Sequence, residues 1–235
     1  MDILSAENIK KSFDEKVILD GVNLTLQQGE LISLLGVSGA GKTTLFNCIS
    51  GIDRPDSGRV VLGGQDITGQ PGHISYMLQK DLLLPYKKII DNVSLPLLLS
   101  GKSKKEARTE AGSHFAQFGL EGTQQQYPAE LSGGMRQRAA LLRTYLAGDR
   151  VALLDEPFSG VDPIAVSDIQ KIVMELRDTD GLSILITDHN VRETLHIVDR
   201  AYILFEGKVI KHGTSEEIAN DPIARKQYLG DQFRM

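Results

Sequence analysis

The sequence predicts an α/β fold with a mainly parallel sheet, an antiparallel β subdomain and a helical insert. Continuous apolar runs such as LISLL at 31–35 and VALLD at 151–155 are typical of strands buried on both faces of a parallel sheet. Amphipathic helical segments alternate with these runs along the chain, as they do in βαβ units. The length of 235 residues favours one domain with subdivisions.

The composition excludes several classes of protein. With 41% hydrophobic and 24% charged residues, the chain has the composition of an ordinary globular protein. The formal net charge of −5 argues against nucleic acid as a partner, because broad binding to a phosphate backbone requires a basic face. Cys48 is the only cysteine, so no internal disulfide and no thiolate zinc cluster can form. We expect no signal peptide, because the amino terminus has no apolar core followed by a small-residue cleavage site. We also expect no membrane span, because charges and prolines interrupt the longest apolar region.

The first third of the chain is predicted to contain short strands. Alternating apolar and polar residues from Ile3 to Leu35 are separated by expected turns at Asp20-Gly21 and Gln28-Gly29. The last strand of this series, LISLL, leads into a glycine-rich loop and then a helix at 42–50. A further strand is expected at 73–79.

From about 87 to 150 the pattern becomes helical. The segment 103–119 begins with a capping box of Ser103 and Glu106 and is predicted as one amphipathic helix. Its apolar face comprises Ala107, Ala111, Phe115 and Phe118. We therefore assign 87–150 to a helical subdomain. Residues 1–86 and 151–235 form the core, with the β subdomain and the C-terminal helix.

Strands and helices alternate again in the last third. Asp162-Pro163 is predicted to cap a helix that follows the VALLD strand, and LSILITDH at 182–189 is a second buried strand. A helix at 190–200, a hairpin turning at Glu206-Gly207 and a capped helix at 214–219 complete the prediction.

A phosphate-binding loop is the first motif with a chemical meaning. GVSGAGKT fills every fixed position of G-x-x-x-x-G-K-[ST], and its small residues let backbone N–H groups converge on phosphate oxygens. Lys42 is expected to reach the β- and γ-phosphates, Thr43 to ligate Mg²⁺ and Thr44 to contact the α-phosphate. An ordinary glycine-rich turn is the alternative. We assign to nucleotide binding Gly36, Val37, Ser38, Gly39, Ala40, Gly41, Lys42 and Thr43.

Two acids end the VALLD strand. A carboxylate at the end of a buried strand can hold Mg²⁺, which is the role we assign to Asp155. An adjacent carboxylate aimed at the γ-phosphate can orient an attacking water, which fits Glu156. Taken alone, acids in this position often cap helices, but the phosphate loop upstream favours the catalytic interpretation.

The stretch LSGGMRQR at 131–138 resembles the signature of the ATP-binding cassette (ABC) ATPases. Other elements of that family follow in order, with Gln79 at the glutamine loop, SGVD at 159–162 and His189 after LSILITD. The resemblance covers essentially the whole chain. It implies a P-loop NTPase fold of the ABC type that hydrolyses Mg·ATP between two copies of the chain. Such a subunit powers a transporter from the cytoplasmic face of the membrane, bound to integral permease subunits.

The resemblance also implies roles that the isolated residues do not. Gln79 would ligate Mg²⁺ or water, and His189 would hold the γ-phosphate and the attacking water. Phe13 would stack on adenine, with a core aromatic as its alternative role, and Asp162 is assigned to the nucleotide site. Three residues of one subunit would close over the γ-phosphate bound by the other: Ser132, Gly133 and Gly134.

The chain resembles two branches of the family. Residues from about 33 to 147 look like the ATPases of nitrate, sulfonate and taurine-type importers, whereas those from Phe158 to the ending YLGDQFRM resemble the lipopolysaccharide-exporter ATPase. This split leaves open a natural subfamily or a chimera joined near LLDEP. Coupling to a permease usually runs through the groove beside Gln79, in the importer-like half, so importer-type transport is favoured. Lipopolysaccharide export and a soluble non-transport ABC ATPase are the alternatives.

Overall fold

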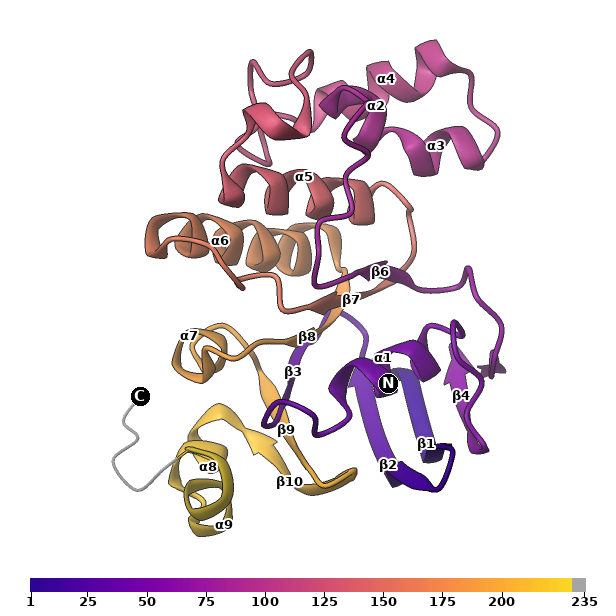
Figure 1. Cartoon of the computed structure of the whole chain (residues 1–235), viewed down its shortest axis with the longest axis vertical. Coiled ribbons are helices and arrows are strands. Elements are labelled where there is room, and N and C mark those ends of the chain that lie inside the picture. Colours follow the sequence, from indigo (N-terminus) through magenta and orange to yellow (C-terminus); the bar gives the residue numbers. More distant parts are fainter. Residues whose placement is uncertain (230–235) are drawn as a thin grey trace.

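The computed structural model describes residues 1–229, which form two sheets and the helices around them (Figure 1). The strands are β1 (Asp2–Phe13), β2 (Lys16–Gln27), β3 (Leu31–Leu35), β4 (Ser57–Leu62), β5 (Gln65–Asp66), β6 (Ser75–Met77), β7 (Val151–Asp155), β8 (Ser183–Thr187), β9 (Arg200–Phe205) and β10 (Lys208–Thr214). The helices are α1 (Lys42–Ile49), α2 (Ile89–Val93), α3 (Leu95–Leu99), α4 (Lys104–Ser113), α5 (Gly133–Tyr145), α6 (Pro163–Asp180), α7 (Val191–Leu195), α8 (Ser215–Asn220) and α9 (Pro222–Ala224). A 3₁₀ turn, η1 (Pro128–Glu130), and a π-helical turn, η2 (Arg225–Leu229), complete the set.

The larger sheet confirms the predicted α/β fold. Its strand order is β10-β9-β3-β8-β7-β6, and every neighbouring pair is parallel except β9 and β10. The second sheet, with the order β2-β1-β4-β5, is antiparallel throughout and is the predicted β subdomain. Figure 1 shows the antiparallel strands on one side of the parallel sheet and α2 to α6 on the other.

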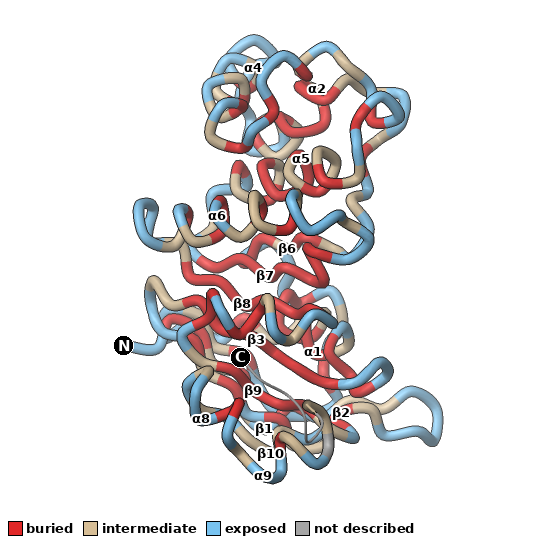
Figure 2. Tube along the Cα trace, turned by 90° about the vertical axis from the view of Figure 1, so that its left-hand side faces the viewer, coloured by how far each residue is buried: buried red, intermediate tan, exposed pale blue. Residues whose placement is uncertain are grey.

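Alternate residues of the central strands enter two separate cores. In β7, Leu154 packs into the core beneath the helices α5 and α6, whereas Leu153 packs into the core shared with the antiparallel sheet. Leu185 and Ile186 of β8 divide in the same way. Because both faces are covered, the strands can be apolar at every position, as the continuous runs predicted. Figure 2 shows this buried band along β3, β7 and β8.

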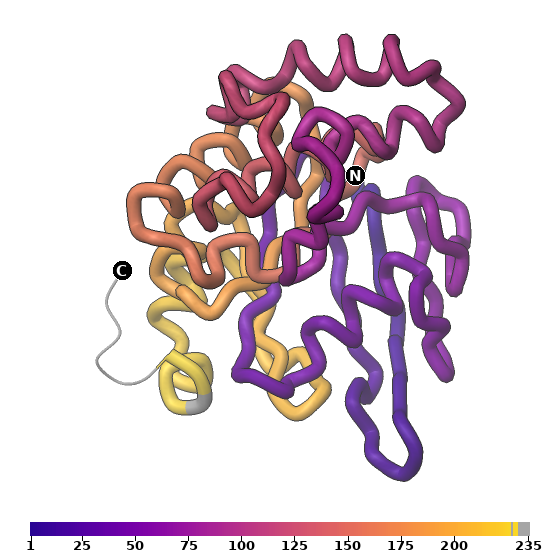
Figure 3. The backbone as a smooth tube through the Cα atoms, turned by 45° about the horizontal axis from the view of Figure 1, so that its top comes forward, coloured from indigo at the N-terminus to yellow at the C-terminus, as the bar shows by residue number. Residues whose placement is uncertain are grey.

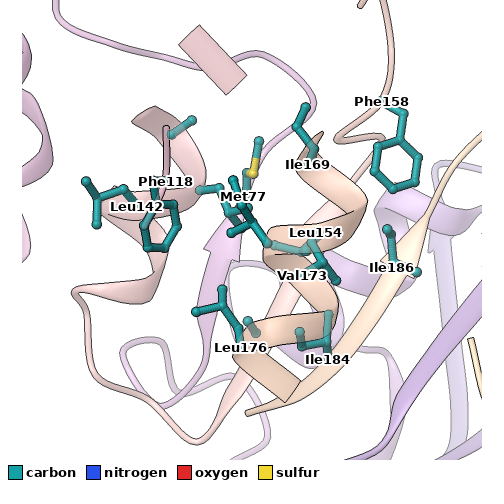
Figure 4. Packing of buried hydrophobic residues seen from close by; sticks show 14 of the residues in the cluster. Met77, Phe118, Leu142, Leu154, Phe158, Ile169, Val173, Leu176, Ile184 and Ile186 are labelled. Carbon is teal, nitrogen blue, oxygen red and sulfur yellow. The ribbon is translucent and has the colours of Figure 1, made fainter. Parts of the chain in front are cut away.

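The core beneath the helices joins the segment 87–150 to the sheet. Figure 4 shows part of it: Met77, Phe118, Leu142, Leu154, Phe158, Ile169, Val173, Leu176, Ile184 and Ile186. In Figure 3 the helices of this segment lie apart from the indigo antiparallel strands, which the second core attaches to the sheet through α1. The division of the chain into a core and a helical subdomain at 87–150 stays a prediction.

Three local predictions are wrong. The helix predicted at 190–200 ends at Leu195, because the chain is already extended at Arg200, where β9 begins and pairs with β3. Asp20-Gly21 is not a turn, because β2 continues through it and Gly21, with φ of 75°, lies at a register shift opposite β1. The chain reverses instead after β1 at Asp14, where φ is 52°. The helix predicted at 103–119 has its capping box but ends at Ser113, because the backbone tightens into successive turns before Gly119.

The predicted apolar face is buried even though α4 ends early. Phe118 is fully buried and its ring centroid lies 5.7 Å from that of Tyr145, so the turns after α4 pack against the end of α5. The other predicted turns are confirmed, with Gly29 between β2 and β3 and Glu206-Gly207 between β9 and β10.

The C-terminal ending YLGDQFRM is only partly described. Tyr228 and Leu229 belong to η2, and Gly230–Met235 lie outside the described residues. Among the helices of residues 1–229, none is long and apolar enough to span a membrane.

The burial of Cys48 predicts that its thiol is unreactive in the folded protein. Cys48 lies on α1 with no exposed surface, and this burial raises the pKa of its thiol to about 11. At about pH 8 roughly one thiol in a thousand would be ionised, and only the thiolate is nucleophilic. We expect an aromatic disulfide reagent to leave the folded protein unlabelled and to titrate the thiol after denaturation, measured by absorbance. Rapid labelling of the folded chain would contradict the burial.

Candidate functional site

The carboxyl ends of the parallel strands open into one cavity of about 390 Å³. Its lining comprises Lys16, Ile18, Ser38, Gly39, Gly41, Lys42, Thr43, Thr44, Gln79, Glu156 and His189. Ligands of open α/β sheets bind at this edge of the sheet. A larger cavity of about 580 Å³ lies at the amino ends of β7 and β8, beside Arg150 and Leu182, and contains none of the predicted site residues.

The phosphate loop joins β3 to α1. Gly36 must be a glycine, because a Cβ there would lie 2.4 Å from the carbonyl oxygen of Leu204. Gly41 is the N-cap of α1 with φ of 106°, a conformation that side chains other than glycine rarely adopt. The loop therefore presents backbone N–H groups and a helix N-terminus to the cavity, which suits a phosphate.

Lys42 is held inside this loop. Its Nζ donates to the carbonyl oxygens of Gly36 at 2.7 Å and Val37 at 3.3 Å. Burial lowers the pKa of Lys42, and the carboxylates of Glu156 and Asp155 oppose that shift. A buried ammonium ion requires compensating groups, and phosphate oxygens would supply them.

Glu156 contacts two other predicted site residues, Gln79 and His189. Its Oε2 accepts a hydrogen bond of 2.6 Å from Gln79 Nε2, and its Oε1 lies 2.6 Å from His189 Nε2. The backbone of Glu156 has φ of 51°, so this side chain leaves the strand end in a left-handed conformation that a non-glycine residue adopts at a cost. The carboxylate is thereby directed between Gln79 and His189, at the cavity that Lys42 also lines.

Asp155 contacts a different set of groups. Its Oδ2 accepts from Thr43 Oγ1 at 3.0 Å, and its Oδ1 accepts from Thr187 Oγ1 at 2.6 Å. Within the described residues, Gln79 hydrogen-bonds to the side chain of Glu156 and not to that of Asp155.

The pairing of Thr43 with Asp155 fits Mg²⁺. This ion is usually bound by one or two carboxylates together with substrate phosphates, and seldom by a cage made of protein alone. Within residues 1–229, no group of three or more His, Cys, Asp and Glu side chains could form such a cage. One carboxylate and one hydroxyl beside a phosphate loop are the donor set expected for magnesium bound to a nucleotide.

Phe13 lies at the rim of this region. Its side chain is 47% exposed at the end of β1, so the alternative of a core aromatic is wrong. Its strand partner is Lys16, which lines the cavity, while Phe13 itself does not. The ring is contacted by Lys11, whose Nζ lies 5.2 Å from the ring centroid.

The signature residues and Asp162 lie outside the cavity. Ser132 caps α5 by accepting from Met135 N at 3.2 Å, and Asp162 caps α6 by accepting from the backbone of Ile164 and Ala165. The two helix starts are in contact, because a Cβ on Gly134 would lie 2.4 Å from the Cβ of Ala165. A single chain therefore does not bring the signature to the phosphate loop.

Several residues near the site were not predicted from the sequence. Ile18 and Lys16 line the cavity from β2, and no local motif singled them out. Asp188 is buried and bridges two segments, because Oδ2 accepts from Phe158 N and Oδ1 from Asn190 N. Burial raises the pKa of Asp188, and those two hydrogen bonds oppose the rise. Its position at the end of LSILITD, matching the acids that end VALLD, was a signal available in the sequence.

Comparisons with known proteins agree with this geometry. A family model described as ABC transporter matches residues 19–159. The lipopolysaccharide export system ATP-binding protein LptB of Haemophilus influenzae is 40% identical over 242 aligned positions, which cover 100% of both chains. A solved nucleotide-free ATP-binding cassette from an ABC transporter has a TM-score of 0.88 at 29% identity, covering 98% of this chain and all of that one. A cassette solved as a dimer with ADP and Pi has a TM-score of 0.82 at 26% identity, covering 90% and 98%.

The LptB alignment bears on the two-branch interpretation. It runs through the importer-like first half as well as the exporter-like second half, on both sides of LLDEP. The comparisons therefore give no support to a chimera joined at that stretch.

The close contact of α5 with α6 predicts that Gly134→Ala destabilises the fold. The new Cβ would clash with Ala165 and approach Val161 at 3.2 Å, and overpacking of this kind costs about 1–3 kcal/mol. We expect the melting temperature to fall by roughly 2–4 °C per kcal/mol. Gly133→Ala is the matched control, since its new Cβ would lie at an ordinary 3.6 Å from the nearest atom, the carbonyl oxygen of Gly160. Equal melting temperatures of the two variants would show that the contact is absent.

Proposed function

This chain belongs to the ABC transporter family, and from that membership we propose how its site works and which transporter it powers. The chain is an ATP hydrolase that uses Mg²⁺, and it acts as the ATP-binding subunit of a transporter. The observation that carries the catalytic proposal is the pair of 2.6 Å contacts that hold Glu156 between Gln79 and His189.

The chemistry is phosphoryl transfer to water. Magnesium ATP supplies the phosphoanhydride bond and a cation that neutralises charge on the phosphate oxygens. Lys42 and the loop amides bind the phosphates, and Thr43 with Asp155 holds the cation. Glu156 orients the attacking water and accepts its proton, while Gln79 and His189 keep that carboxylate in place.

Two copies of the chain complete each site. The signature residues lie outside the cavity of their own chain, and Ser132 is exposed at the N-terminus of α5. A helix N-terminus with small residues suits an anion, so a second copy arranged head to tail can present Ser132 to the γ-phosphate. Support comes from the similar cassette that was solved as a dimer with ADP and Pi. We assign Asp162, the N-cap of α6, to the same dimer contact.

Lipopolysaccharide export is better supported than importer-type transport. The full-length similarity to LptB favours lipopolysaccharide export, which was an alternative in the interpretation of the sequence. The chain then works at the cytoplasmic face of the membrane, bound to integral membrane subunits. The segment that follows Gln79 exposes Leu82 (51%) and Tyr86 (73%), which gives such subunits an apolar surface beside the site.

Glu156→Gln tests the catalytic proposal. The amide keeps the size of the side chain but cannot accept a proton from water, so phosphate release should fall by at least about 100-fold. ATP should still bind and should now accumulate dimers, detected by light scattering after gel filtration. Glu121→Gln changes an exposed acid far along the chain and should behave like the parent. Near-parental hydrolysis by Glu156→Gln would refute its role as the base.

Co-purification tests the choice of transporter. The chain is co-expressed in turn with lipopolysaccharide-export membrane subunits and with an importer-type permease, and the complex extracted in detergent is assayed for ATP hydrolysis. We expect capture by the exporter subunits, and we expect Leu82→Asp to abolish it. Leu99→Asp is the control, because Leu99 is an equally apolar side chain that is 87% exposed at the end of α3, outside the segment that follows Gln79. Capture by the importer permease alone would overturn the export proposal.

A further inference from the structure

Thr187 is the last residue of β8 and has no exposed surface. The parallel register places it directly opposite Asp155 on β7. Thr187 has no role in the sequence motifs beyond its place in the strand LSILITDH, and it does not line the cavity. Its hydroxyl nevertheless hydrogen-bonds to groups of both neighbouring acids, Asp155 and Glu156.

The hydrogen-bond roles at the Thr187 hydroxyl are forced by chemistry. Thr187 Oγ1 donates its single proton to the carboxylate oxygen Oδ1 of Asp155, at 2.6 Å. The backbone N–H of Glu156 can only donate, so it occupies a lone pair of the same oxygen, at 3.1 Å. One hydroxyl therefore links the side chain of Asp155 to the backbone of Glu156.

The bond to Asp155 assigns its two carboxylate oxygens to different partners. Oδ1 is held by Thr187 inside the sheet, and Oδ2 remains on the side of Thr43, whose hydroxyl lies 3.0 Å away. Thr43 lines the cavity. Oδ2, which bonds to Thr43, is therefore the carboxylate oxygen that faces the phosphate loop. Rotation of the carboxylate would break the bond to Thr187.

The bond to Glu156 stabilises a strained backbone. The N–H of Glu156 is held by both the carbonyl oxygen of Thr187, at 2.9 Å, and its hydroxyl, at 3.1 Å. The residue so held has φ of 51°, and such conformations persist only where the surroundings enforce them. This conformation directs the Glu156 side chain between Gln79 and His189.

We propose that Thr187 is a positioning residue that orients the Asp155 carboxylate for the metal and holds the Glu156 backbone for catalysis. The proposal rests on the proposed function of the same site. Its competitor is a structural role, in which a β-branched residue simply fills the end of a buried strand. Valine would serve that structural role equally well, because it keeps the shape and loses only the hydroxyl.

The experiment compares Thr187→Val with Thr187→Ser and a control. In purified protein, the Mg²⁺ concentration that half-saturates binding of a fluorescent ATP analogue is measured, followed by kcat and KM for ATP. Thr187→Val should raise the half-saturating Mg²⁺ and lower kcat by about 10- to 100-fold each, the usual range for groups that orient metal ligands. Thr187→Ser retains the hydroxyl and should recover most of both values. Thr123→Val removes another buried hydroxyl, one bonded to the carbonyl of Leu120, and should match the parent.

Two results would overturn the proposal. One is Thr187→Val with the parent's Mg²⁺ dependence and kcat, and the other is Thr187→Ser impaired as severely as Thr187→Val, which would implicate the methyl group. If the valine variant does not fold, the serine variant decides alone: its Mg²⁺ dependence stays near the parent's or the proposal fails. A parent that binds Mg·ATP without hydrolysing it would refute the proposed function, while the Mg²⁺ titration would still test Thr187.

Discussion

The parallel register of β3, β8 and β7 is the constraint on which the site depends. Leu31 pairs with Ile184 and Asp155 pairs with Thr187, so the three strands end at the same edge of the sheet. The phosphate loop follows the first strand, His189 follows the second and Glu156 follows the third. A slip of one residue in this register would turn every side chain to the opposite face and separate Thr187 from Asp155. The two cores on the faces of the sheet prevent such a slip.

The site contains several charged side chains that are buried away from water. Asp155, Glu156 and Asp188 are buried carboxylates around one buried ammonium, that of Lys42. Each is held by hydrogen bonds, from hydroxyls to Asp155, from Gln79 to Glu156 and from backbone amides to Asp188. Such an arrangement is stable only while these partners remain in place, because an unpaired buried charge costs several kcal/mol, on the order of 3–5. The acids therefore suit a polyphosphate that arrives with a divalent cation.

The helices add a different constraint, which is close packing. Gly134 allows the N-terminus of α5 to lie against Ala165 of α6, and Asp162 and Ser132 cap these two helices side by side. The signature residue Gly134 therefore has a packing role in the fold, besides the nucleotide contact proposed for the signature. Because these helix starts do not line the cavity of their own chain, the proposed chemistry requires the signature of a second copy.

The sequence by itself determined the motifs and the strands that carry them. Lys42, Thr43, Asp155 and Glu156 were predictable because a phosphate loop and acids at the ends of apolar runs depend on local spacing alone. The burial of Phe118 was predicted correctly from its hydrophobicity, whereas its place in a helix was not, because α4 ends at Ser113. Only the tertiary structure decided the contacts of Gln79 with Glu156 and of Thr187 with both acids. Those contacts join residues 31 to 77 positions apart, which strand register brings together and no local pattern encodes.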